Sequence, residues 1–170
     1  MVLLQIEIKF DWDKMKQENF NSRRLTVPGL ILLILYIGPI RGRTKLQKEV
    51  FLAWHEVFGE YFAIDPIFHP DQFGPYSQLV VDTQAFLKSK NEIRVISRGE
   101  GHQTFVISEK GKSTLKKELV HSDMPEKLIR TLKEKKTDWD EWTAKGIMRY
   151  IYRNYPYYGI KARIKELKWE

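Results

Sequence analysis

A helix predicted over residues 74–90 carries mostly uncharged hydrogen-bonding side chains on one face, many of them near its start. A glutamine can pair with adenine through two hydrogen bonds, and a serine or tyrosine hydroxyl can bind a phosphate oxygen. Recognition helices read base edges with residues near their N-terminal ends. The residues expected to face DNA are Tyr76, Ser77, Gln78, Gln84 and Lys88. Asp82 lies on the same helix and, as an anion, would have to point away from DNA.

Two groups of cations flank this helix in the sequence. One crowds the start of a helix predicted over 41–58, where positive charges oppose the helix macrodipole. A phosphate of a bound partner would explain that placement, and neutralisation by Glu49, Glu56 and solvent is the alternative. The other group lies on a hairpin predicted over 93–107, whose tip also carries Glu100. The cations expected to clamp or flank the DNA backbone are Arg41, Arg43, Lys45, Lys48, Arg94, Arg98 and His102.

Residue patterns that indicate an enzyme are sparse. The histidines at positions 55, 69, 102 and 121 are scattered, with no pair at metal-ligand spacing. The sequence has no phosphate-binding glycine loop and no nucleophile elbow. Asp71 followed by Glu92-Ile93-Arg94 partly resembles a metal-dependent nuclease core, which requires a lysine where Arg94 stands. We therefore predict no enzymatic activity and no cofactor, with a nuclease as the third hypothesis.

The composition favours a polyanionic partner. Lys and Arg number 29 against 22 Asp and Glu, a formal net charge of +7. Such a surplus favours nucleic acid first and anionic membranes second, and a solvated basic surface is the alternative. The sequence has no cysteine, which excludes disulfides, thiol catalysis and cysteine-ligated zinc fingers. Since this composition is typical of intracellular and of thermophilic proteins, we expect a cytoplasmic, soluble protein.

Hydrophobic patterning predicts the elements that position these residues. Alternation over Val2–Phe10 indicates a half-buried strand. The segment Thr26–Gly38 is apolar on nearly all sides, which indicates a helix in the middle of the core. The apolar run Gly29–Ile40 is too short to span a bilayer, and the N-terminus shows no signal peptide. The aromatic and proline-rich segment Phe62–Phe73 is expected to pack over the helices as a lid.

The helix over 74–90 is predicted to begin with Gly74 as its cap and Pro75 in its first turn. Its core side is expected to carry Val80, Thr83, Phe86 and Leu87. Beyond the hairpin, Ser108 is predicted to cap a further helix. The later helices are expected from Met124-Pro125 to about Lys136, over Asp138–Tyr155, and over Ile160–Trp169. Their aromatic residues could pack on the preceding domain or mediate dimerisation.

Several short segments resemble uncharacterised prokaryotic winged helix-turn-helix proteins, a group distantly similar to Panacea-type antitoxin domains. The segments are Arg43–Lys48 leading into Phe51-Leu52, Phe73–Ser77, the strand from Ile93, Ile107–Gly111, and Tyr155–Tyr158 with Lys161. The resemblance covers about residues 29–164, and the extension over 1–24 departs from it. It implies a winged-helix fold, and either DNA-binding regulation or an antitoxin-like association with another protein.

Together these patterns predict a mainly α fold with a small β element, a winged helix-turn-helix with additional C-terminal helices. The domain boundaries expected are an extension with a strand over 1–25, the winged helix over 26–120 and a helical extension over 121–170. We expect a transcriptional regulator that binds double-stranded DNA as a homodimer, with the 74–90 helix in the major groove and the 93–107 hairpin as the wing. The alternative is an antitoxin-like or other protein-interaction module. We expect no association with a membrane and no metal site.

Overall fold

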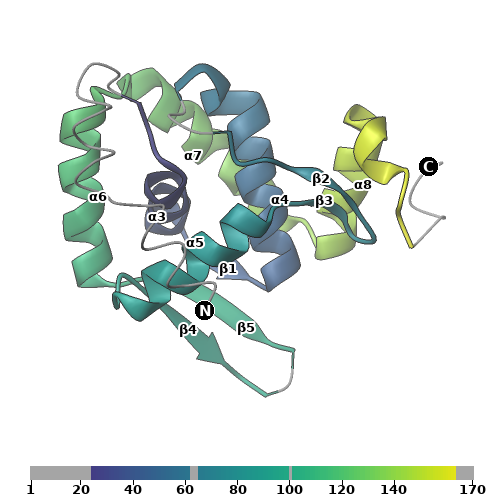
Figure 1. The fold of residues 1–170 in the computed structure, drawn as a ribbon, viewed down its shortest axis with the longest axis horizontal. Coiled ribbons are helices and arrows are strands. Elements are labelled where there is room, and N and C mark those ends of the chain that lie inside the picture. The colour runs from purple at the N-terminus through teal and green to yellow at the C-terminus, as the bar shows by residue number, and fades with distance from the viewer. Residues whose placement is uncertain (1–23, 62–64, 100, 164–170) are drawn as a thin grey trace.

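The computed structural model describes residues 24–61, 65–99 and 101–163, which are mainly helical with two small antiparallel sheets (Figure 1). The helices are α3 (Val27–Ile37), α4 (Arg43–Ala53), α5 (Gln78–Ser89), α6 (Glu109–Ser122), α7 (Glu126–Glu141) and α8 (Ala144–Asn154). The strands are β1 (Ile40–Arg41), β2 (His69–Asp71), β3 (Gly74–Tyr76), β4 (Ile93–Ser97) and β5 (Gln103–Ile107). A π-helical turn, η1 (Trp54–Phe58), extends α4, and the 3-10 turns are η2 (Gly59–Tyr61) and η3 (Pro156–Gly159).

Some of the predicted features lie outside the described residues. They are the strand Val2–Phe10, the first residues of the aromatic segment at 62–64, Glu100 at the hairpin tip, and residues 164–169 of the predicted closing helix. The described part of that closing segment, residues 160–163, follows η3 as a turn and a bend. None of the described helices combines the length and the apolar composition needed to cross a bilayer.

Helix α3 forms the centre of the core, as its all-round apolar sequence predicts. Residues 27–35 are all buried, and Figure 1 shows the helix end-on, with α6 on one side and α4 on the other. The Thr26 side chain caps it by accepting a hydrogen bond from Gly29 N at 3.2 Å. Each fully buried leucine or isoleucine contributes about 1.5–3 kcal/mol of transfer free energy. The predicted buried helix over 26–38 is therefore confirmed.

The predicted hairpin over 93–107 belongs to a three-stranded sheet. Strand β4 pairs with β5 in a register that sets Ile93 opposite Ile107, and β1 adds to the other side of β5. Strand β1 lies where the sequence predicted the start of a helix. Pro39 disfavours helical geometry at Gly38, which is extended (ψ 157°), so the chain enters β1 before α4 begins.

A second hairpin, β2–β3, lies where the sequence predicted two other features. The segment before α5 forms a pair of short strands with His69 opposite Tyr76, where the sequence predicted an irregular lid. Gly74 and Pro75 lie in β3, so the prediction that they open the helix is wrong. The φ of Gly74 is +86°, a conformation that favours glycine, and the true cap of α5 is Ser77.

Helix α6 begins as predicted, with Ser108 as its cap. The hydroxyl of Ser108 also donates to the carbonyl of Glu92 at 2.9 Å, which ties α6 to the start of β4. Gly111 allows this close approach, because a Cβ at that position would collide with the Glu92 carbonyl oxygen. A side chain at position 111 would therefore push α6 away from the sheet.

The C-terminal helices divide at a different place from the one predicted. Helix α7 continues past Lys136 to Glu141, and the chain breaks at Trp142, whose ψ is 141°. Thr143 then caps α8 by accepting a hydrogen bond from Gly146 N at 3.0 Å. The prediction of an uninterrupted helix over Asp138–Tyr155 is therefore wrong. Leucine, tryptophan and isoleucine side chains of α7 and α8 lie in the same buried cluster as α3.

Candidate nucleic-acid interface

The start of α5 is anchored to α4 and to the preceding segment. The amide of Gln47 bonds Ser77 twice, donating to its carbonyl and accepting from its N–H, both at 3.0 Å. The Ser77 hydroxyl donates to the Pro66 carbonyl and accepts from Val80 N at 3.2 Å. These bonds use fully buried groups, so they fix the position and direction of the helix.

The exposed start of α5 carries a chain of hydrogen bonds. The Tyr76 hydroxyl donates to Gln78 Oε1 at 2.8 Å, and Gln78 Nε2 donates to Asp82 Oδ1 at 2.9 Å. Residues four apart share a helix face, so Asp82 lies on the same side as Gln78, which corrects the expectation that it points away from the face meant to meet DNA. Further along, Lys88 is exposed and Gln84 is half-buried beside it. Gln78 retains one amide hydrogen and one lone pair for a base edge.

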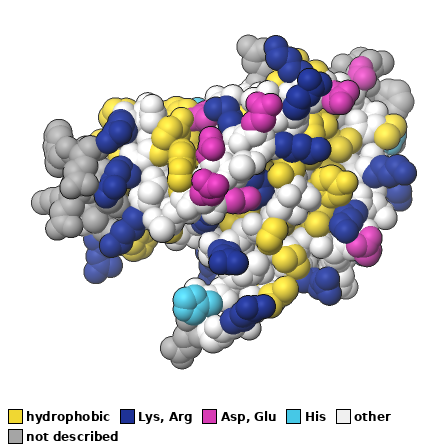
Figure 2. Space-filling model, turned by 180° about the vertical axis from the view of Figure 1, so that it is seen from behind, with side chains coloured by type: hydrophobic (Ala, Val, Ile, Leu, Met, Phe, Trp, Pro, Cys, Tyr) yellow, Lys and Arg dark blue, Asp and Glu magenta, His cyan; other side chains and the backbone are white. Residues whose placement is uncertain are grey.

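The strand register places three arginines and His102 together on the solvent face of the three-stranded sheet. Arg94, Ile96 and Arg98 alternate along β4 and its extension, and Arg41 lies two strands across from Ile96. The ladder continues beyond the strands through a bond from Arg98 N to the His102 carbonyl at 3.0 Å. The other face belongs to the core and carries Ile40, Ile93 and Phe105. All four side chains are exposed, and Figure 2 shows basic side chains along the projecting hairpin.

Arg43 joins this basic face to the first turn of α4. Its Nε donates to Gln103 Oε1 at 2.9 Å, while the residue itself stays exposed. Gly42 N donates to the Gln103 carbonyl at 2.8 Å, which extends the β1–β5 pairing by one residue. Because of these two bonds, cations from residues 41–43 and 94–102 lie together although they are distant in the sequence.

Three residues expected at the interface are buried instead. Lys48 is 2% exposed and its Nζ donates to the Pro75 carbonyl at 2.9 Å. Lys45 is 8% exposed and its Nζ donates to the Asp140 carbonyl at 3.1 Å. Ser77 is fully buried as the cap of α5. Their polar groups bind other parts of the protein, which corrects the expectation that they contact DNA, and we leave them out of the interface.

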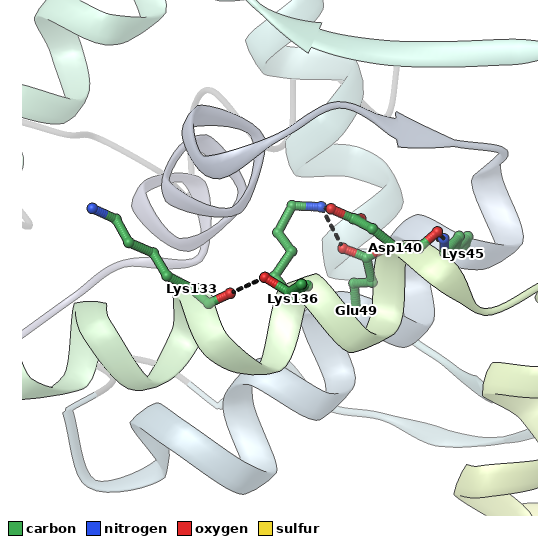
Figure 3. Close-up of polar contacts among 6 residues, drawn as sticks. Lys45, Glu49, Lys133, Lys136 and Asp140 are labelled. Carbon is green, nitrogen blue, oxygen red and sulfur yellow. Dashed lines mark hydrogen bonds and ion pairs between the residues drawn. The ribbon is translucent and has the colours of Figure 1, made fainter.

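A buried ion cluster explains why Lys45 turns inward. The Lys136 ammonium lies 3.1 Å from Glu49 Oε2 and 2.7 Å from Asp140 Oδ1, between α4 and α7 (Figure 3). Lys45 Nζ lies 3.9 Å from Glu49 Oε1, the only buried side-chain polar atom of the described residues that lacks a hydrogen bond. The alternative of neutralisation by Glu49 is therefore the one that the structure supports for Lys45. The sequence analysis missed Lys136, although its spacing to Asp140 fits an i,i+4 pair.

Burial shifts the pKa values of these groups toward their neutral forms. Desolvation raises the pKa of Glu49 to about 7, against the opposing attraction of Lys136. Desolvation lowers the pKa of Lys48 to about 8, with Asp71 opposing, and it also lowers the pKa of Lys45. The carboxyl of Glu49 therefore titrates near neutral pH.

The residues considered for a nuclease core lie in separate places. Asp71 belongs to β2 of the two-stranded sheet, whereas Glu92 precedes β4 and accepts a hydrogen bond from Thr114 Oγ1 at 2.8 Å. In the part of the chain that the structure describes, no group of three His, Asp or Glu residues could hold a metal ion. The described residues therefore do not bring together the acidic groups that the nuclease hypothesis requires.

Comparison with known proteins finds no match for this chain. No family model, curated protein or solved structure matches it. The resemblance to winged-helix and Panacea-type proteins therefore stays a prediction that rests on the short segments named above.

Proposed function

We propose that this protein binds double-stranded DNA through α5 and the β4–β5 hairpin. The observation that carries the proposal is the exposed basic face of the three-stranded sheet, where Arg41, Arg94 and Arg98 supply the positive charge and His102 lies beside them. The strands β1, β4 and β5 contain no acidic residue, so the strand side chains add no negative charge to this face, and Glu100 belongs to the loop between β4 and β5. Phosphate neutralisation by such cations supplies most of the affinity in non-specific DNA binding.

The order of elements supports a winged helix-turn-helix as the scaffold. The helices α3, α4 and α5 are followed by the hairpin β4–β5, and β1 between α3 and α4 completes its sheet. In this arrangement the second helix of the pair enters the major groove and the hairpin flanks it. Gln78, Gln84 and Lys88 would then face the bases, with Tyr76 near the backbone. A role as a transcriptional regulator is part of this proposal.

Fluorescence anisotropy on a random duplex at several salt concentrations tests the proposal. We expect binding that weakens log-linearly with salt, since counterions are released from the DNA. Arg94→Gln and Arg98→Gln should each lower the salt slope by about one unit and weaken binding to all sequences alike. Both side chains are exposed, so these variants should keep the unfolding free energy of the parent.

The control removes the same charge from α7, which Figure 1 places away from the hairpin. Arg130→Gln and Lys133→Gln alter exposed residues of that helix and should leave the slope unchanged. Equal losses from both pairs of variants would show that net charge alone causes binding. Absence of binding at low salt would reject the proposal.

Exposed apolar side chains favour protein interaction as the second candidate. Ile67 is 66% exposed and Phe73 is 43% exposed around the β2–β3 hairpin. Tyr157, in η3, and Ile160 are 62% and 59% exposed, and η3 contacts β2. Substituting Ile67 and Phe73 with serine should abolish capture of a protein partner and leave duplex binding intact. Unchanged capture by the substituted protein would reject these side chains as a protein-binding surface.

A further inference from the structure

A recess of about 250 Å³ lies along α8, apart from the proposed DNA-binding face. It is lined by Trp142, Gly146, Arg149, Tyr150 and Arg153. Residues 146, 149, 150 and 153 are three or four apart and therefore share one face of the helix. Figure 1 draws α8 at the right, which is the left in the reversed view of Figure 2, where Lys and Arg side chains are seen.

Two arginines supply the charge of this recess. Arg149 and Arg153 are exposed and one helical turn apart. A guanidinium presents several N–H groups in a planar fork that matches phosphate oxygens better than an ammonium does. Two such groups on adjacent turns can bind a single phosphate from the same side.

Two aromatic rings supply an apolar surface next to this charge. The Trp142 and Tyr150 rings lie with centroids 5.0 Å apart and planes inclined by 38°. The Tyr150 hydroxyl donates to Glu56 Oε1 at 2.8 Å, which fixes the ring by its polar end. Gly146 adds no side chain, and a Cβ there would lie 3.5 Å from Trp142 Cβ. The glycine thus keeps the recess open beside the indole.

We propose that this recess binds a nucleotide, with the phosphate on Arg149 and Arg153 and the base against Trp142 and Tyr150. Stacking on aromatic rings combined with arginine–phosphate contacts is how proteins hold unpaired nucleotides. At about 250 Å³ the recess is smaller than the roughly 300 Å³ at which pockets for drug-sized ligands begin, so we expect it to hold no more than a single nucleotide unit, with the phosphate at its open edge. The proposal uses no residue of α5 or of the β4–β5 hairpin and is independent of the proposed function.

Isothermal titration calorimetry of the full chain with adenosine monophosphate tests the site. We expect adenosine monophosphate to bind about tenfold more tightly, or better, than either adenosine or inorganic phosphate. Each of these two ligands engages only half of the recess. Arg149→Gln and Arg153→Gln should each weaken binding about tenfold, the usual loss for one charged hydrogen-bond partner. Absence of detectable heat with the nucleotide, under conditions where the fold is intact, would overturn the proposal.

Two variants of the same helix separate this site from general electrostatic attraction. Lys145→Gln removes a charge from an exposed residue of α8 that does not line the recess, and it should leave affinity unchanged. Gly146→Leu adds bulk to the recess without changing charge and should abolish binding while α8 stays folded, as circular dichroism would verify. A loss with Lys145→Gln equal to that with Arg149→Gln, or full affinity in Gly146→Leu, would overturn the proposal.

The nucleotide could be free or could be the 5′ end of a single strand. A short 5′-phosphorylated single strand that displaces adenosine monophosphate, while its 5′-hydroxyl form does not, would assign the strand end. Failure of both strands to displace the nucleotide would assign the free form. Duplex binding by the Gly146→Leu variant should be unaffected, so failure of this proposal and failure of the DNA-binding proposal are distinguishable.

Discussion

Cations that are close in sequence have different surroundings in the fold. Arg41 and Arg43 are exposed beside the three-stranded sheet, whereas Lys45 and Lys48 are buried against β3 and α7. All four were expected to clamp the DNA backbone, because sequence spacing alone does not distinguish them. The two exposed arginines lie on a surface that could bind phosphates. The two buried lysines instead affect the stability of the fold.

The chemistry of the two side chains accounts for this division. An ammonium presents three N–H groups, and its pKa can fall on burial, as the pKa of Lys48 does. A guanidinium stays charged and carries five N–H groups, so its burial requires more acceptors. In this fold the lysines of α4 therefore lie inside, and the neighbouring arginines keep their forks in solvent.

The largest effect is expected from removal of the buried ammonium of Lys136. Lys136→Met leaves the Glu49 carboxylate buried without its partner and should lower the free energy of unfolding by about 3–5 kcal/mol at pH 8. Lys133→Met changes an exposed neighbour on the same helix and should shift it by about 0.5 kcal/mol or less. Urea unfolding measures both values. Equal small losses would show that the pair contributes nothing to the folded state.

The raised pKa of Glu49 predicts a loss of stability as pH rises. Its ordinary pKa of 4.5 applies to the unfolded chain and about 7 to the folded one, so the folded state binds more protons between these values. The free energy of unfolding should therefore fall between pH 4.5 and pH 7, by roughly 3 kcal/mol from this group. Burial lowers the pKa of His55, which acts in the opposite direction.

Comparison of the parent with Glu49→Gln isolates that contribution. The variant keeps the shape of the side chain and loses its titration, so its urea midpoint should change less between pH 5 and pH 7. Identical pH profiles for the two proteins would show that Glu49 does not titrate in this range.

Most of the fold was predictable from local patterns. The apolar helix at 27–37, the caps Thr26 and Ser108, and the β4–β5 hairpin all follow from residue type and period. The β2–β3 hairpin did not follow, because Gly74-Pro75 suits a helix start as well as a strand pair. Strand β1 was missed because its two residues carry no periodic signal, and β5 alone creates it by pairing.

The candidate interface was predictable only in part, for a related reason. Alternation along the hairpin put Arg94 and Arg98 on the solvent face, which a period of two can indicate. Burial of Lys45 and Lys48 depends on Asp140 and Pro75, which are distant in the sequence. The spacing of the lysines in the sequence does not indicate long-range contacts of that kind. The recess on α8 required the helix break at Trp142, which was likewise not predicted.

Substitution of one exposed and one buried cation of α4 tests the division directly. Arg43→Gln should lower the salt slope of duplex binding by about one unit and leave the free energy of unfolding nearly unchanged. Lys48→Met should leave the salt slope unchanged, because its ammonium already binds the Pro75 carbonyl inside the protein. Anisotropy and urea unfolding of the same preparations measure both quantities. A lower slope for Lys48→Met would mean that this lysine contacts DNA.

The smallest effect is expected at Asp82, the carboxylate beside Gln78 on the face of α5 that is proposed to meet DNA. Asp82→Asn keeps an oxygen that can accept the Gln78 Nε2 bond and removes a charge that repels phosphates. Two charges about 10 Å apart in water interact by about 0.4 kcal/mol, so duplex affinity should rise about twofold at low salt. Asp138→Asn removes an exposed charge from α7 and should change affinity less. Because salt screens this repulsion, the gain should vanish at high salt. Unchanged affinity in Asp82→Asn would place the start of α5 away from the DNA and leave the sheet face as the only contact.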